Sequence, residues 1–176
     1  MKIKLILLVL LTDLIFIGSC SDKLTNPSGT EPFDDDEIYQ LILENKFTEP
    51  DYQLVLIDST HGENFAPESI TWLNENFPEL QVETFSNYQF LNQEHIKLKT
   101  IPGIPSLILA SEFSGQKVNL KYVYFSRIGY DTNHSQALLS SGIMYSDIET
   151  GGGFLHFLQK KKGVWQLRNS IQTWIP

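Results

Sequence analysis

The segmentation of the last third of the chain constrains the fold most. From Lys117 onward, short segments rich in β-branched and aromatic residues alternate with clusters of turn-forming residues, which is typical of an antiparallel meander. We expect four strands, at residues 118–130, 136–145, 153–159 and 164–175. The predicted turns lie between them, at residues 131–134, 147–152 and 160–163. A sheet of this kind needs further elements to cover its apolar side, so the preceding residues must supply them.

The last predicted strand alternates between apolar and polar residues. Its apolar positions are Trp165, Leu167, Ile171 and Ile175. Because successive side chains of a strand point to opposite faces of the sheet, we expect these four side chains to face the core of the domain together.

Two helices are predicted before the meander. The first opens with the acidic run 34–37 (DDDE), which suits a helix cap and first turn, and its apolar residues Ile38, Leu41 and Ile42 recur at helical spacing as far as Phe47. A calcium-binding loop is the alternative for the acidic run, but such a loop needs alternating ligands, a glycine and a distal glutamate. The spacing of this run favours a capped helix.

The second predicted helix has Pro67 in its first turn and ends at Pro78. Its residues Ile70, Leu73 and Phe77 share one face. Shorter core segments are expected at residues 54–57, 80–85 and 107–109, the first as a buried strand and the second as a short strand, while residues 86–106 are left open. The sequence therefore predicts one α+β domain over residues 34–176, with two amino-terminal helices packed on one face of a mainly antiparallel sheet.

Two resemblances refine this expectation. The lysine turn and the residues 163–167 (GVWQL) resemble the final hairpin of exported bacterial domains that have cystatin-like or NTF2-like curved sheets. A longer stretch, from Phe125 through Gln136 to Ile175, resembles a family of secreted bacterial proteins with no assigned activity. The second resemblance therefore implies no catalytic residues.

The first 19 residues have the layout of a signal peptide. Lys2 and Lys4 precede the apolar segment 5–17, and small residues follow it. As a helix, this apolar segment would span only about 20 Å, which is shorter than the hydrocarbon core of a bilayer, roughly 30 Å thick. We therefore expect a leader that is removed on export.

The expected cleavage site identifies the class of leader. Ile17, Gly18, Ser19 and Cys20 resemble the lipobox of bacterial lipoproteins, and Cys20 is the only cysteine of the chain. The resemblance implies cleavage before Cys20 and attachment of diacylglycerol, with palmitate-type chains, to its sulfur. Ser21, in place of the aspartate that favours inner-membrane retention in enterobacteria, favours the outer membrane. The alternative is an ordinary secreted protein, whose peptidase prefers a small-x-small pattern.

Residues 20–33 have the composition of a flexible linker, with Pro27, Gly29 and Pro32 among polar residues. The chain has a formal charge of −8 and a pI near 4.9, and removing residues 1–19 changes the charge to −9. This sign disfavours nucleic acid and anionic headgroups as partners. The membrane is therefore reached through the lipid on Cys20, and a protein or small-molecule partner stays open.

The best local constellation for chemistry is the segment 58–63 (DSTHGE), directly after the predicted strand 54–57. Asp58 and His61 could share a divalent metal, with Glu63 as a third ligand. The alternative is a polar turn whose side chains bind nearby backbone, and the sequence has no paired-histidine spacing that fixes a metal site. No catalytic, cofactor or metal residue is therefore assigned, and an anchored hydrolase-like enzyme that uses Asp58 and His61 is the alternative function.

The predicted strand 118–130 carries large residues on both faces. Tyr122 and Tyr124 alternate with Val123 and Phe125, so one pair fills the core and the other requires a different explanation. We expect part of one face to form a ligand groove or a partner surface. The sequence thus predicts a lipid-anchored envelope protein with a binding or structural role and no cofactor, whose ligand it does not identify.

Overall fold

The computed structural model describes residues 32–47, 49–62, 65, 69–104, 106–115, 119–147 and 150–174. The leader, Cys20 and the linker up to residue 31 lie outside the described residues. In the described part of the chain, no helix combines the length and the apolar character that a membrane span needs.

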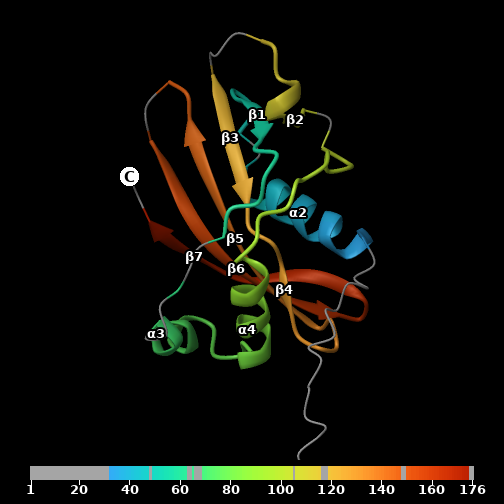
Figure 1. Ribbon diagram of the computed structural model, residues 1–176, viewed down its shortest axis with the longest axis vertical. Coiled ribbons are helices and arrows are strands. Elements are labelled where there is room, and N and C mark those ends of the chain that lie inside the picture. The colour runs from blue at the N-terminus through green and yellow to red at the C-terminus, as the bar shows by residue number, and fades with distance from the viewer. Residues whose placement is uncertain are drawn as a thin grey trace, which may run out of the picture. The chain divides into compact units, whose positions relative to one another are not determined.

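The unit Phe33–Pro176 contains helices and one sheet (Figure 1). Its helices are α2 (Pro32–Lys46), α3 (Ser69–Asn76), α4 (Val82–Leu91) and the short 3₁₀ helix η1 (Ala110–Glu112). Its strands are β1 (Gln53–Leu56), β2 (Ile108–Leu109), β3 (Leu120–Phe125), β4 (Gly129–Tyr130), β5 (Gln136–Tyr145), β6 (Gly151–Lys161) and β7 (Val164–Trp174). The α+β class, the helices α2 and α3, and the first and last strands of the chain, β1 and β7, are as predicted.

The sheet has the strand order β2-β1-β3-β5-β6-β7, and β4 also pairs with β5. The pairs β3-β5, β5-β6 and β6-β7 are antiparallel, which confirms the predicted meander. Strand β1 is parallel to both of its neighbours, β2 and β3. The expected strand 118–130 is divided into β3 and β4, because Ser126 leaves the strand and exchanges hydrogen bonds with Ser140 through its Oγ and its backbone nitrogen.

The predicted common face of β7 is wrong. Leu167 pairs with Leu158, but Asn169 pairs with Phe157, so the strand carries one extra residue at Arg168. A bulge of this kind reverses which side chains face which way beyond it. Trp165 and Leu167 therefore pack against the cluster under α2, whereas Ile171 packs against the opposite cluster.

The expectation that the helices cover one face of the sheet is also wrong. Helix α2 packs on one face, where its side chains meet Val123, Phe125 and Leu139. Helices α3 and α4 pack on the other face, against Leu138 and Leu155. The reason lies in β5, which is buried on both faces over residues 136–142 and so requires cover on both sides.

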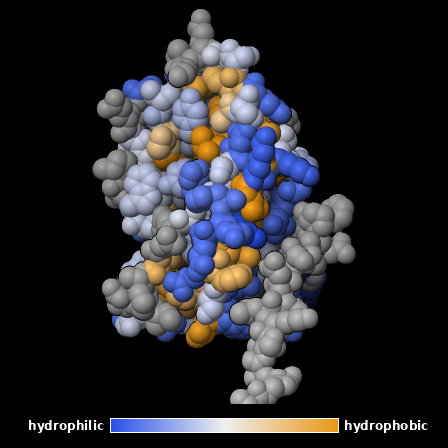
Figure 2. Space-filling model, viewed as in Figure 1, coloured by the Kyte–Doolittle hydropathy of each residue, from blue (hydrophilic) through white to orange (hydrophobic). Residues whose placement is uncertain are grey.

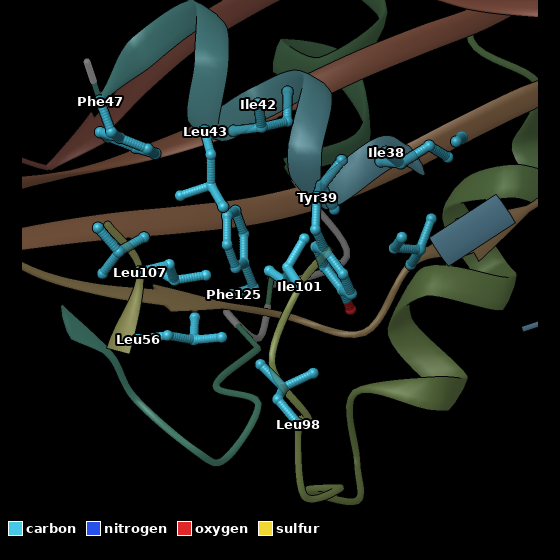
Figure 3. Close-up of a cluster of buried hydrophobic side chains, with 14 of the residues drawn as sticks. Ile38, Tyr39, Ile42, Leu43, Phe47, Leu56, Leu98, Ile101, Leu107 and Phe125 are labelled. Carbon is cyan, nitrogen blue, oxygen red and sulfur yellow. The ribbon is translucent and has the colours of Figure 1, made fainter. Parts of the chain in front are cut away.

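Figure 3 shows the cluster on the α2 side of the sheet, with Ile38, Tyr39, Ile42 and Leu43 of the helix facing the strands. The ring of Tyr39 lies 4.8 Å from that of Phe125. Its hydroxyl donates a hydrogen bond of 2.9 Å to the backbone oxygen of Ser126, so the phenol is satisfied although it is buried.

The predicted strand at residues 80–85 is helix α4 instead. Its local sequence (VETF) has strand-like β-branched and aromatic residues, but Phe85 and Tyr88 are buried at helical spacing on the sheet. Gln136 holds the helix start, because its Oε1 accepts a hydrogen bond of 2.9 Å from the backbone of Gln81. A contact between residues 55 positions apart in the sequence therefore helps to override the local preference.

Candidate functional site

In the segment that follows β1, the side chains of Asp58 and His61 contact different partners. Asp58 accepts a hydrogen bond of 3.0 Å from the backbone nitrogen of Ser111, in η1. Hydrogen bonding by Ser111 holds the pKa of Asp58 below its ordinary value. The carboxylate thus binds a neighbouring turn, as the polar-turn alternative predicts.

His61 lies against other partners. Its ring centroid is 5.4 Å from that of His95 and 6.0 Å from that of Tyr124. His95 in turn donates from Nδ1 to the backbone oxygen of Thr60. Glu63 lies outside the described residues. Among the residues that are described, no group of three or more potential ligands could hold a metal ion.

The two pairs of large side chains on β3 divide between the faces of the sheet. Val123 and Phe125 are fully buried in the cluster under α2. Tyr122 and Tyr124 point to the opposite face, and both are partly exposed. This is the division that the sequence predicted, and it leaves the tyrosines on the side of the sheet that carries α3 and α4.

A single row of paired residues crosses four strands on this side. Tyr124 pairs with Gly142, Gly142 with Gly153, and Gly153 with Trp174. A Cβ atom at Gly142 would overlap the ring of Tyr124, and one at Gly153 would overlap the indole of Trp174. The two aromatic rings therefore lie across the two glycines, which form a floor without side chains.

The next row outward continues the surface. Tyr122 pairs with Met144, whose side chain is 53% exposed, and Met144 pairs with Gly151. We call the six residues of these rows that carry the argument the tyrosine face, and they are Tyr122, Tyr124, Gly142, Met144, Gly153 and Trp174. None of them is charged, and Tyr122, Tyr124, Met144 and Trp174 keep exposed surface.

The tyrosine face begins where the helical cover of the sheet ends. In the row before it, Ser140 of β5 is fully buried and accepts a hydrogen bond of 3.1 Å from the hydroxyl of Tyr88, in α4. Phe65 packs on the same helix, with its ring 6.1 Å from that of Tyr88. Figure 2 shows that hydrophobic residues on the surface in this view occur as small separate areas among pale and hydrophilic ones.

The alternation along β3 predicts Tyr122 and Tyr124 as site residues, but it does not predict that Gly142 and Gly153 lie beneath aromatic rings. The available signal was a glycine within each of two strand-like segments, because glycine inside a strand often marks a place where another group approaches the backbone closely.

One further charged side chain, that of Lys121, is buried on the α2 side, and its partner Glu49 is half exposed. The Nζ atom of Lys121 lies 2.9 Å from Oε2 of Glu49, and the rings of Phe47 and Tyr145 lie within 5.9 Å and 5.3 Å of it. Tyr145 donates to the same carboxylate. The ion pair tethers the chain after α2 to the sheet, and the lysine side chain is almost fully buried, so its role is structural.

A separate hollow of about 190 Å³ lies beside α3. Its walls include Phe77 and Phe157, and Arg168, the extra residue of β7, borders it. It is smaller than typical ligand pockets, which measure roughly 300–1,000 Å³, so the tyrosine face is the stronger candidate.

Comparisons with known proteins found no relative of this chain. No protein-family model matches the chain, and neither a curated protein nor a solved structure matches it.

Proposed function

We propose that this chain is a bacterial lipoprotein whose body binds a ligand through the tyrosine face. It is exported, cleaved before Cys20 and held in the cell envelope by lipid on that cysteine, with the outer membrane favoured over the inner one. The observation that carries the binding role is the row in which the rings of Tyr124 and Trp174 cover paired glycines and still keep exposed surface.

The anchor is supported by sequence. The lipobox pattern ends at the only cysteine, and a linker of about 13 residues follows it; as a flexible chain it reaches roughly 20 Å. Each buried methylene contributes about 0.8 kcal/mol to membrane attachment, and two or more acyl chains anchor a protein stably. The net charge of −9 after cleavage gives no electrostatic attraction to anionic lipids, so the lipid holds the protein.

The binding role is supported by the distribution of aromatic residues. Aromatic side chains that only fill a core are expected to be buried, as Phe125 is. Tyr122, Tyr124 and Trp174 instead gather, partly exposed, on one uncharged stretch of sheet. Large aromatic side chains grouped at a surface are typical of recognition sites, because they offer a large contact area at a small cost in conformational entropy.

A finer assignment of the fold, to cystatin-like or NTF2-like curved sheets, belongs to this proposal. The terminal hairpin at residues 160–167 and the four antiparallel strands β3, β5, β6 and β7 support it. An experimental structure tests it: superposition of these four strands on a sheet of either kind, with helix α2 in the same place, is the expected result.

The anchor is tested by metabolic labelling with an alkyne analogue of palmitate in a bacterial host. The wild-type chain should take up the label, and mass spectrometry should find Cys20 as the first residue, carrying diacylglycerol. Cys20→Ser should remain unlabelled and about 19 residues longer, while the control Ser21→Ala should be labelled like the wild type. Labelling of Cys20→Ser, or an unmodified wild-type amino terminus, would contradict the proposal.

A further inference from the structure

We infer that His61 and His95 form a binding site for a late first-row transition metal ion, such as Zn²⁺ or Cu²⁺. The two histidines come from different loops, and His61 also lies beside Tyr124, at the edge of the tyrosine face. The metal site goes beyond the binding role proposed for that face and is independent of it.

The spacing of the two rings suits a shared ion. An imidazole nitrogen binds Zn²⁺ at about 2.0–2.1 Å, so the centroids of two rings on one tetrahedral ion lie about 5 Å apart. The ring centroids of His61 and His95 are 5.4 Å apart, and the ring planes are inclined by 42°. Both side chains are exposed. A shared ion therefore requires at most a rotation of these two side chains, and no movement of the backbone.

His95 is already oriented as a metal ligand. Its Nδ1 atom bonds to the backbone oxygen of Thr60, and because a carbonyl oxygen can only accept, Nδ1 carries the proton. In a neutral imidazole of this tautomer, Nε2 keeps the lone pair that binds a metal. A histidine that ligates a metal almost always donates its other N–H to a carboxylate, a backbone carbonyl or water. The bond to Thr60 provides this support.

Backbone hydrogen bonds hold the two loops together. The backbone nitrogen of Thr60 donates to the backbone oxygen of Ile96 at 2.9 Å, and the backbone nitrogen of Ile96 donates to Oγ1 of Thr60 at 2.9 Å. His61 is bound to the sheet, because its backbone nitrogen donates to the backbone oxygen of Phe125 at 2.7 Å. The fold, and not the ion, therefore orders the backbone of the pair, which lowers the entropic cost of binding.

The residue after His61 allows the loops to approach closely. A Cβ atom at Gly62 would overlap the side chain of Asn92, just after α4. Asn92 is buried, and its side chain is hydrogen-bonded to the backbone of Tyr88 and of Arg127, so it cannot move aside. The loop of His61 thus lies against the end of α4, from which the chain continues to His95.

The donor atoms select the class of ion. Imidazole nitrogen suits Zn²⁺, Cu²⁺ and Ni²⁺, whereas Mg²⁺ and Ca²⁺ prefer oxygen ligands. Asp58 is not a ligand, because its carboxylate binds the backbone of Ser111. Since no group of three ligands occurs in the described part of the chain, water completes the coordination there. We expect an exchangeable ion, with Cu²⁺ bound more tightly than Zn²⁺.

The test uses the full chain, purified in detergent without a polyhistidine tag and freed of metal with a chelator that is then removed. Calorimetric titration with Cu²⁺ or with Zn²⁺ should show saturable binding of one ion per chain. His61→Gln and His95→Gln should each weaken this binding by about tenfold or more, because even the loss of a supporting contact to a ligand costs 10–100-fold. Electron paramagnetic resonance of bound Cu²⁺ should show coupling to two imidazole nitrogens in the wild type and to one in each variant.

Two matched variants serve as controls. His134→Gln removes a histidine from the loop between β4 and β5, and Asp58→Asn removes the charge of the carboxylate that precedes the site; both should bind like the wild type. Urea unfolding checks the fold of every variant. If His95→Gln lowers the urea midpoint because it loses the bond to Thr60, the result for His61→Gln decides.

The inference is overturned if neither Cu²⁺ nor Zn²⁺ binds in a saturable way, or if both histidine variants bind like the wild type. Binding that both histidine variants keep and that Cys20→Ser loses would place the ion on a free thiol, and would also contradict the proposed lipid on Cys20. Binding of inorganic phosphate that requires both histidines, without metal binding, would refute the metal ion in favour of an anion.

Discussion

At the scale of single residues, His156 shows how the sheet accommodates a titratable group in its core. The side chain has no exposed surface. Its Nε2 atom lies 2.7 Å from Oγ of Ser141 and its Nδ1 atom lies 2.9 Å from Oγ of Ser170, so both ring nitrogens are hydrogen-bonded. Burial, assisted by the positive charge of Lys46, lowers the pKa of His156 to about 3, and the imidazole is therefore neutral at neutral pH.

This pKa predicts a specific dependence of stability on pH. Between about pH 6.5 and pH 3, the unfolded chain binds a proton at His156 and the folded chain does not. The free energy of unfolding contributed by this group is therefore complete above pH 6.5 and is lost as the pH falls toward 3. We expect urea midpoints measured at pH 7, 5 and 4 to fall less steeply in His156→Gln than in the wild type.

The control for this measurement is His95→Gln, since His95 is exposed. That variant should keep the wild-type slope, because it leaves the buried His156 in place. Equal slopes in His156→Gln and the wild type would contradict the neutral, buried imidazole. The sequence contains four histidines but does not show which one is buried. The burial of His156 depends on residues from three strands, which come together only in the assembled sheet.

At the scale of elements, the best-predicted parts are those with strong local signals. Strand β5 has the bounds expected from the sequence, residues 136–145, since polar turn clusters border an unbroken run of strand-forming residues. Helix α2 likewise has the predicted apolar spacing, although it begins at Pro32, two residues before the acidic run that was expected to cap it. Helix α4 was predicted as a strand, and only its packing against β4 and β5 explains why it is helical.

The close packing of α4 on β4 depends on one glycine. A Cβ atom at Gly129 would overlap the backbone of Tyr88, in the middle of α4, and backbone cannot move aside as a flexible side chain can. We expect Gly129→Ala to lower the free energy of unfolding by about 1–3 kcal/mol through overpacking. Urea unfolding monitored by far-UV circular dichroism measures this loss.

Gly152→Ala is the matched control on β6. Its nearest neighbour would be the side-chain amide of Gln172, at 3.2 Å, which can rotate away. The control should therefore change stability by less than about 1 kcal/mol. A loss in Gly152→Ala as large as that in Gly129→Ala would mean that strand propensity, and not the approach of α4, determines the effect.

At the scale of the whole described domain, two hydrophobic clusters share the same central strands. Leu138 faces α3 and α4, and Leu139, its neighbour on β5, faces α2. Both side chains are fully buried. Because one strand belongs to both clusters, loss of either cluster removes the support of the other, and the domain should unfold in one cooperative step.

We expect Leu138→Ala and Leu139→Ala each to lower the free energy of unfolding by about 2–5 kcal/mol, the cost of a cavity in a core. In both variants, tryptophan fluorescence and far-UV circular dichroism should give the same urea midpoint. Val164→Ala, at a side chain that is 57% exposed, should shift that midpoint little. Two separate transitions in either leucine variant would show that the clusters unfold independently.

The sequence by itself determined the meander, the helices α2 and α3, the α+β class and the two faces of β3, since turns, caps and side-chain spacing act over a few residues. It also supplied the expectations for the leader and for Cys20, which stay predictions. Only the tertiary structure decided the placement of helices on both faces, the helical state of residues 82–91 and the row of aromatic rings over glycines. These features depend on contacts between residues that are not neighbours in the chain, such as Gly142 with Tyr124. A local sequence pattern cannot predict such contacts.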